Sequence, residues 1–350
     1  MAKLDYFNQR NIDTLRKLEH IKLDLPKFCN EFFVGIQNNT SPLTRLSYAY
    51  DLRIFFDFVC NKLLCTKVPI DLQLSDIERL TAFDIECFLD YLNSYTYGDK
   101  ELQSGDCAKE RKLCAIRALI KYFFKKDLLT KDIGSKISSV KIKQSNIIRL
   151  ETDEVANLLD NVEYSTYDVS PHQRRYLTQT RLRDLVVLTL FLGTGIRVSE
   201  LVGLDTTDID FRNNSFCITR KGGNKSILYF NTEVAKSLNE YCMWRQEYVA
   251  SRHLDTNALF LSMQGKRISV RAVELLVKKY AKQISPLKKI SPHKLRSTFG
   301  TQLYRDTQDI YVVAEVLGHK DINTTKKHYA QTSEEIKRAA ANTVILRDKQ

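Results

Sequence analysis

A stretch without hydrophobic periodicity, residues 134–150, divides the sequence into two parts that follow different patterns. Before it, apolar residues recur every three or four positions, which is typical of amphipathic helices packed around a core. After it, helical runs alternate with short strand-like pieces. The chain has 350 residues, of which 43% are hydrophobic, enough for two packed domains. The sequence therefore predicts a helical N-terminal domain, a linker and a C-terminal domain of helices and strands.

The N-terminal part contains three amphipathic runs before about Leu129. The first begins at Ser41-Pro42, a typical start of a helix. The third run covers residues 109–126 and carries basic residues on the positions outside its apolar stripe: Lys109, Arg111, Lys112, Arg117, Lys121, Lys125 and Lys126. Such a face either lies against DNA or is an ordinary solvated surface. Residues 1–25 are polar and predict a leading helix or arm.

The C-terminal part shows both helical and extended patterns. Residues 163–180 predict a loop insertion, and Leu182–Leu192 predict a buried helix. Strand-like residues 215–219 and 226–230 flank a glycine turn, which predicts a β-hairpin with Lys221 near its tip. The remainder is mostly helical to about residue 340.

The positive charge favours a polyanionic partner. The net charge is +12, and the excess is concentrated in residues 101–150, with 12 Lys/Arg and 5 Asp/Glu, and in 251–300, with 11 and 2. Two basic stretches are what two lobes holding a phosphate backbone need. Many basic proteins bind no nucleic acid, and two solvated helical faces would give the same count.

The cysteines and the hydropathy together predict the cellular location. The eight cysteines form no CxxC pair and no metal-ligand spacing, and most lie in apolar patterns, so we expect reduced, buried thiols and no metal site. No stretch approaches the roughly 18 apolar residues of a membrane span, and no secretion signal is present. The expected location is the cytoplasm, without a membrane.

A set of residues suited to phosphodiester chemistry lies in the C-terminal part. Cleavage without metal or ATP needs a nucleophile, cations for the phosphorane and an acid for the leaving oxygen. Arg197 and Arg296 suit the cation role because guanidinium pairs with two phosphate oxygens at once. His293 and Arg296 share one helical face at spacing i, i+3. The ordinary alternative for Arg197 is a surface ion pair with Glu200, three residues on.

The remaining candidates are individually weak. His319 follows a glycine and would, alone, be a structural histidine. Tyr329 is one of 17 tyrosines, yet it follows Lys326-Lys327-His328 and is less core-like than Tyr304 or Tyr311. Lys221 can serve as a general acid if neighbouring cations lower its pKa. The basic residues predicted to contact DNA phosphates are Arg220, Lys225 and Lys294 here and Lys112 and Lys121 in the N-terminal part.

The ordered set resembles the signature of a known family. Arg197, Lys221 in its hairpin, His293-x-x-Arg296, His319 and Tyr329 resemble the six-residue signature of the tyrosine recombinases, most closely of the bacterial Xer type. The resemblance is strong over about 150–340 and only architectural over 25–130. The glycine hairpin and the 163–180 insertion also resemble the single-protein Xer of streptococci.

The resemblance implies roles for these residues. Tyr329 would attack the scissile phosphate and form a 3′-phosphotyrosyl link, leaving a free 5′ hydroxyl. Arg197, His293, Arg296 and His319 would hold the phosphate, Lys221 would be the acid, and Glu200 would brace the site. No cofactor is implied. The partner would be double-stranded DNA with an inverted-repeat site, bound by a homotetramer on two duplexes in the bacterial nucleoid and joined through a Holliday junction.

The resemblance also implies an architecture. The fold class would be mainly α, with a SAM-like N-terminal core-binding domain and a mixed α/β catalytic domain that form a C-shaped clamp on DNA. The expected boundaries are a leading helix or arm at 1–25, the N-terminal domain at 26–133, the linker at 134–150, the catalytic domain at 151–334 and a tail helix for protomer docking at 335–350.

Two departures leave the biological role open. His319 and Tyr329 are ten residues apart, where Xer proteins usually have nine and integrases of conjugative elements often have ten; Ser297 replaces a frequent histidine. Chromosome dimer resolution and mobile-element integration or excision therefore both stay open, as does the need for a host or septal activator protein. The alternatives in activity are a DNA-binding protein that keeps the fold without cutting, and a type IB topoisomerase.

Overall fold

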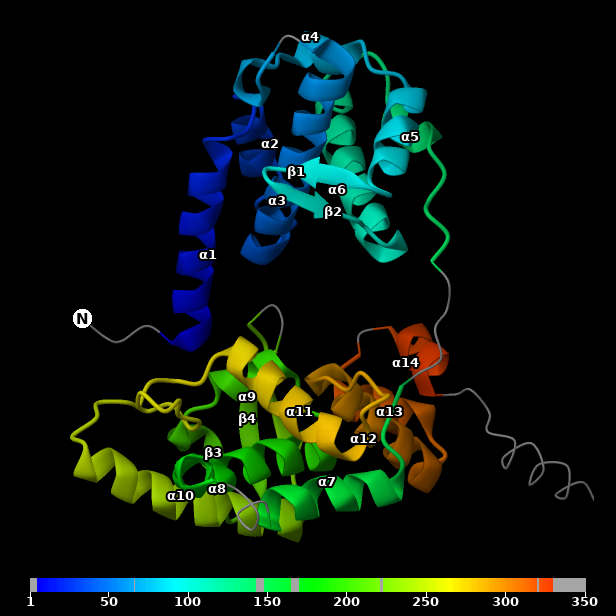
Figure 1. Cartoon of the computed structure of the whole chain (residues 1–350). Coiled ribbons are helices and arrows are strands. Elements are labelled where there is room, and N and C mark those ends of the chain that lie inside the picture. Colours follow the sequence, from blue (N-terminus) through cyan, green and yellow to red (C-terminus); the bar gives the residue numbers. More distant parts are fainter. Residues whose placement is uncertain are drawn as a thin grey trace, which may run out of the picture. The chain divides into compact units, whose positions relative to one another are not determined.

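The computed structural model describes residues 5–65, 67–142, 148–164, 170–220, 223–319 and 321–329, without the side chains of 171–176, 324 and 327–329. The chain divides into two compact units, residues 1–145 and 146–350 (Figure 1). The first is helical with one small hairpin, and the second combines helices with a three-stranded antiparallel sheet. The predicted fold class, mainly α with a mixed α/β C-terminal domain, is confirmed.

The N-terminal unit is built on helices around a phenylalanine-rich core. Its elements are α1 (Tyr6–Lys22), α2 (Cys29–Gly35), α3 (Pro42–Phe58), a π-helical turn (Val59–Leu64), a 3-10 turn (Pro69–Asp71), α4 (Leu74–Glu78), α5 (Ala82–Tyr91), α6 (Asp106–Phe124) and a second 3-10 turn (Ile133–Lys136). Phe55, Phe56 and Phe88 are fully enclosed in the core. The start of α3 is as predicted, because Ser41 Oγ accepts the amide of Thr44 at 3.2 Å.

The leading segment is a helix that belongs to this core. Asp5 caps α1, accepting the amide of Asn8 at 2.8 Å. Leu18 and Ile21 of α1 are buried in the same cluster as the phenylalanines. A helix with this much buried apolar surface is held in place, so the N-terminal unit begins well before residue 26.

A short hairpin interrupts the region that the pattern assigned to helices. Strands β1 (Tyr95–Tyr97) and β2 (Lys100–Leu102) pair antiparallel, with Tyr97 opposite Lys100. Gly98 takes a left-handed φ of 58° in the turn. The signal was Tyr-Thr-Tyr followed by Gly-Asp, which is too short to outweigh the helical pattern around it.

The basic face of α6 is smaller than predicted. Lys112 does not lie on an outer face: it is 4% exposed, and its Nζ lies 3.6 Å from a carboxylate oxygen of Asp51, which is 1% exposed. Arg111 donates to both oxygens of the same carboxylate, at 2.9 Å each. The periodicity misled here because a buried carboxylate on α3 draws this lysine inward. Lys121 is exposed, as predicted.

Arg117 of α6 also serves the fold, because it holds the first half of the predicted linker. Its guanidinium donates to the carbonyl of Gly134 at 3.1 Å, to that of Ile137, and to Ser139 Oγ at 3.0 Å. The amide of Val140 donates to Glu110 at 2.7 Å. The chain therefore stays packed on α6 up to Val140, and residues 143–147 of the predicted linker lie outside the described residues.

The C-terminal unit surrounds the long helix α8. Its elements are α7 (Thr152–Tyr164), α8 (Pro171–Thr194), α9 (Val198–Gly203), a 3-10 turn (Thr206–Asp208), β3 (Ile209–Asp210), β4 (Ser215–Thr219), β5 (Lys225–Tyr229), α10 (Thr232–Ser251), α11 (Val270–Ile284), α12 (Pro292–Thr307), α13 (Ile310–Leu317) and α14 (Ile322–Tyr329). Helix α8 packs against α7, α10 and α12. Its apolar centre is fully buried at Val186, Val187 and Phe191.

Two predictions for this unit need correction. The loop predicted over 163–180 is helical from Pro171 onward, because α8 begins there. The hairpin of β4 and β5 is confirmed, but Lys225 lies in strand β5, paired with Thr219, and not in the turn. Lys221 and the tail at 335–350 lie outside the described residues.

The cysteines are less buried than their apolar sequence neighbours predict. All eight cysteines are free thiols, and Cys29 and Cys60 are buried, but Cys65, Cys107 and Cys114 are exposed. The expectation of buried thiols is therefore wrong for these three, and Cys87, Cys217 and Cys242 are half-buried. Within the described ranges, no helix is long and apolar enough to cross a membrane.

The ion pairs of Asp51 predict a strong dependence of stability on this residue. In Asp51→Ala, Lys112 stays buried without a countercharge, so we expect the free energy of unfolding of the N-terminal unit to fall by about 3–5 kcal/mol. Urea unfolding followed by circular dichroism measures the change. The matched control is Asp13→Ala, which removes an ion pair with Arg16 whose side chains are 52% and 74% exposed, and it should change stability by less than about 0.5 kcal/mol. Equal losses in the two variants would contradict the prediction.

Candidate active site

The turn between α8 and α9 has a geometry that only glycine suits. Gly195 has a φ of +62°, and a Cβ there would lie 2.5 Å from the ring of Phe299 and 2.8 Å from Leu317. Thr194 Oγ1 donates to the carbonyl of Leu190 at 2.6 Å and accepts the amide of Ile196 at 3.3 Å. These bonds close the end of α8, and Ile196 is fully buried.

Arg197 follows this turn and is held by Glu200. The carboxylate of Glu200 accepts the Arg197 amide at 2.9 Å and its Nη1 at 2.8 Å. The Glu200 side chain is 2% exposed and that of Arg197 is 33% exposed. The ion pair with Glu200 therefore exists, but it is not a surface pair. It anchors a guanidinium that stays one-third exposed.

Arg296 is the buried member of the set. It lies on α12, is 3% exposed, and donates to the carbonyls of Gly195 and Leu317. These acceptors belong to the ends of α8 and α13. The guanidinium therefore ties the ends of α8 and α13 to α12.

The end of α13 collects guanidinium groups. The carbonyl of Leu317 also accepts Arg220 Nη1 at 2.8 Å, and the carbonyl of Gly318 accepts Arg197 Nη2 at 3.1 Å. Three arginines, at 197, 220 and 296, thus share the carbonyls that end one helix. A helix C-terminus carries partial negative charge, which stabilises cations placed there.

His319 leaves this helix end through a left-handed cap. Gly318 has a φ of 62°, and the His319 amide bonds back to the carbonyl of Ala314 at 2.9 Å. The His319 Nδ1 lies 2.8 Å from Oγ1 of Thr325, which is fully buried on α14. The imidazole is therefore oriented by the same short helix that ends at Tyr329.

The other predicted residues are placed less centrally. His293 is exposed in the first turn of α12, one turn before Arg296, and Lys294 beside it is half-buried. Lys225 is exposed on β5. The structure thus brings Arg197, Arg296 and His319 together around the end of α13, with His293 on the helix of Arg296. The side chains of Lys221 and Tyr329 are outside the described ones.

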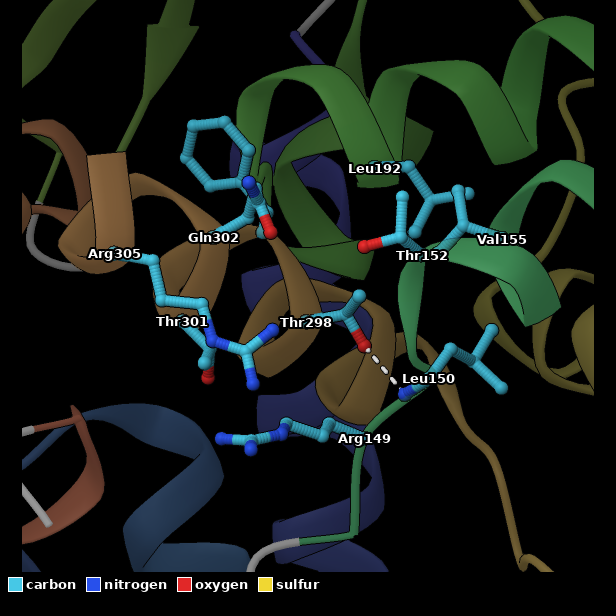
Figure 2. Close-up of a pocket in the computed structure, with 10 residues that line it drawn as sticks. Arg149, Leu150, Thr152, Val155, Leu192, Thr298, Thr301, Gln302 and Arg305 are labelled. Atoms are coloured by element: carbon cyan, nitrogen blue, oxygen red, sulfur yellow. Dashed lines mark hydrogen bonds between the residues drawn. The ribbon is translucent and has the colours of Figure 1, made fainter. Parts of the chain in front are cut away.

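Sequence reasoning missed the role of Arg220 and a nearby pocket. A cavity of about 100 Å³ lies between α7, α8 and α12 (Figure 2). Its lining includes the apolar Leu192 and Phe299 and the basic Arg149 and Arg305. The amide of Leu150 donates to Thr298 Oγ1 at 3.0 Å, so the chain enters this unit attached to α12 (Figure 2). None of the predicted catalytic residues lines it. No cluster of metal-ligating side chains occurs in the described part of the chain.

Comparison with known proteins gives the family. The model of the phage integrase family matches residues 148–335. The chain belongs to the phage integrase family. Tyrosine recombinase XerC of Caldanaerobacter subterraneus is 31% identical over 314 residues, which cover 87% of this chain and 83% of the relative. Tyrosine recombinase XerS of Streptococcus thermophilus is 27% identical and covers 94% and 98%. The chain is thus a tyrosine recombinase.

Solved structures agree with this recombinase fold. The XerH site-specific recombinase bound to its palindromic difH substrate aligns with a TM-score of 0.65 at 20% identity, over 87% of this chain and 80% of that one. The Tn1549 transposon integrase bound to transposon right end DNA aligns at 0.62 and 18%, over 90% and 98%. The similarity to XerC covers 87% of this chain and so extends beyond residues 150–340, where the motifs predicted the strong resemblance.

The buried contact between Glu200 and Arg197 predicts a large effect of a small substitution. Glu200→Gln keeps the side-chain shape but places an amide N–H against the guanidinium donors, so we expect the free energy of unfolding to fall by about 2 kcal/mol. Thermal and urea unfolding measure this loss. Glu274→Gln is the matched control, since Arg271 and Glu274 have the same i, i+3 spacing with side chains 75% and 44% exposed, and it should change little. Indistinguishable variants would refute the structural role of Glu200.

Proposed function

We propose that this tyrosine recombinase cuts and rejoins double-stranded DNA with Tyr329 as the nucleophile. The observation that carries the proposal is the convergence of Arg197, Arg296 and His319 at the end of α13, one short helix before Tyr329. Cations gathered at one point suit the charge of a pentavalent phosphorane. A phenol on the adjoining helix is the group able to hold a strand covalently.

The reaction follows from these groups. The Tyr329 oxygen attacks the scissile phosphorus, its proton passes to water, and the bond from phosphorus to the 5′ oxygen breaks. The products are a 3′-phosphotyrosyl link and a 5′ hydroxyl, whose proton comes from Lys221. Arg197, Arg296, His293 and His319 stabilise the phosphate, and Glu200 holds Arg197. The link conserves the energy of the broken bond, so the reverse attack by a 5′ hydroxyl rejoins a strand.

DNA binding rests on charge and on the two-unit layout. The net charge is +12, and Lys121, Lys225 and Lys294 are the proposed phosphate contacts. Lys112 is withdrawn because its ammonium is buried beside Asp51. We propose that the two units, residues 1–145 and 146–350, act as a clamp on the duplex. XerH and the Tn1549 integrase are themselves described as DNA complexes.

The assembly and the biological role extend the proposal. Four copies would bind two duplexes carrying inverted-repeat sites and exchange strands through a Holliday junction, each docking the tail at 335–350 on a neighbour. The setting would be the bacterial cytoplasm and nucleoid, for chromosome dimer resolution or for movement of a mobile element. An imperfect inverted repeat beside the gene, and the genes around it, separate these roles. Recombination with and without cell extract tests for an activator protein.

The proposed nucleophile is tested with nicked suicide DNA carrying the cognate site. Wild-type protein should form a covalent adduct stable to denaturing electrophoresis, and Tyr329→Phe should form none because it lacks the attacking oxygen. Tyr311→Phe is the control: Tyr311 is 69% exposed on α13, and its loss should leave the adduct unchanged. A wild-type protein that binds this DNA without forming an adduct would favour the DNA-binding alternative. Relaxation of plasmid without site preference would favour a topoisomerase.

The cation set predicts that cleavage needs no divalent metal and no ATP. Guanidinium and imidazole groups offset the phosphorane charge, so excess EDTA should change the single-turnover cleavage rate by less than about 2-fold. The measurement uses the same suicide DNA at fixed ionic strength, since DNA affinity depends on salt. Loss of cleavage in EDTA, restored by added Mg²⁺, would contradict the proposed chemistry.

A further inference from the structure

Arg220 is fixed at both its backbone and its side chain. Its amide donates to the carbonyl of Asn224 at 2.8 Å, and its carbonyl accepts the amide of Gly223 at 3.0 Å, which holds the end of the β4–β5 hairpin. Its guanidinium donates through Nη1 to the carbonyl of Leu317 at 2.8 Å and through Nη2 to that of Val316 at 3.2 Å. The side chain therefore bridges the sheet to the last turn of α13.

The contact requires a glycine on the other side. A Cβ on Gly318 would lie 2.0 Å from Arg220 Nη1 and 2.3 Å from its Cζ. Gly318 also has a φ of +62°, in the left-handed region that favours glycine. The guanidinium thus occupies the space that a side chain at position 318 would need. Two independent constraints on Gly318, one conformational and one steric, meet at this contact.

The Arg220 guanidinium is a half-buried cation. Burial lowers the pKa of Arg220, Glu200 opposes this shift, and the neighbouring Arg197 adds to it. A guanidinium keeps its charge under such a shift. The carbonyls at the end of α13 compensate this charge, since a helix C-terminus stabilises cations. These carbonyl acceptors therefore hold the Arg220 guanidinium in place at the end of α13.

The contact is coupled to the proposed active site through a shared acceptor. The carbonyl of Leu317 accepts both Arg220 and Arg296. The next carbonyl, that of Gly318, accepts Arg197. His319 follows directly. A shift of this helix end would therefore move the acceptors of both phosphate-binding arginines and the imidazole together.

We propose that Arg220 is a positioning residue, which fixes the end of α13 so that Arg197, Arg296 and His319 meet the scissile phosphate. This inference rests on the proposed recombinase reaction and replaces the expectation that Arg220 contacts a DNA phosphate. The two roles differ in what they change. A phosphate contact sets affinity and its salt dependence. A positioning residue sets the rate of cleavage once DNA is bound.

The test compares the full-length protein with Arg220→Ala, Arg220→Lys and Arg212→Ala on nicked suicide DNA. Two quantities are measured. One is the single-turnover rate of adduct formation at saturating protein. The other is the dissociation constant between about 50 and 200 mM salt, a range over which phosphate contacts make the affinity fall. Arg212 is the control, because it is an exposed arginine in the turn between β3 and β4 of the same sheet. It should behave as wild type.

Arg220→Ala should cleave about 100-fold more slowly at saturation, as expected for a displacement of about 1 Å in an active site. Its dissociation constant should stay within about 2-fold of wild type, with an unchanged salt slope. Arg220→Lys keeps the charge and most of the length, but one ammonium does not reproduce the fork that spans two carbonyls. Arg220→Lys should fold like wild type and also cleave slowly. If Arg220→Ala is unstable, the cleavage rate of Arg220→Lys tests the positioning role.

Two outcomes would overturn the proposal. A salt slope reduced by about one in Arg220→Ala would show that Arg220 neutralises a phosphate. Cleavage by Arg220→Lys at the wild-type rate would show that charge alone suffices. Failure of the wild-type protein to form any adduct is a separate result, because it refutes the recombinase reaction and not the position of Arg220.

Discussion

The C-terminal unit depends on the carbonyl groups that end α13. A helix leaves its last carbonyls without internal partners, and here those of Val316, Leu317 and Gly318 accept guanidinium groups from a β-hairpin, from α12 and from the start of α9. An element with only eight residues thereby organises side chains that are far apart in sequence. Carbonyl oxygens thus hold most of these cations, and the carboxylate of Glu200 pairs with Arg197.

The motif order was readable from the sequence because the chemistry demands particular side chains. Only Arg, His, Lys and Tyr suit the proposed steps, and their order matches a family to which the chain belongs. The hairpin around the glycine turn was readable because alternation and turn residues are local signals. The start of α8 at Pro171 was not readable, since polar, tyrosine-containing residues resemble a loop until packing selects the helix.

Side-chain partners at long range were the main limit. Lys112 was assigned to a solvated face from its position in the helical period, but Asp51 on another helix draws it into the interior. Arg220 was assigned to DNA from its charge, but its acceptors lie almost a hundred residues later, at a distance that no local pattern encodes. The positions of both side chains have one physical origin. A charge can be buried when a specific countercharge or helix end waits for it, and sequence periodicity reports only hydrophobicity.

The Leu317 carbonyl limits which substitutions this site accepts. An amide oxygen has two lone pairs, and here both are occupied, one by Arg220 and one by Arg296. Neither arginine can therefore be exchanged for a different donor without altering the geometry left to the other. The proposed phosphate contacts, the exposed Lys225 and the half-buried Lys294, can instead vary one at a time as a DNA site changes. Because the Leu317 carbonyl accepts both arginines, the hairpin, the end of α13 and the buried Arg296 have to change together.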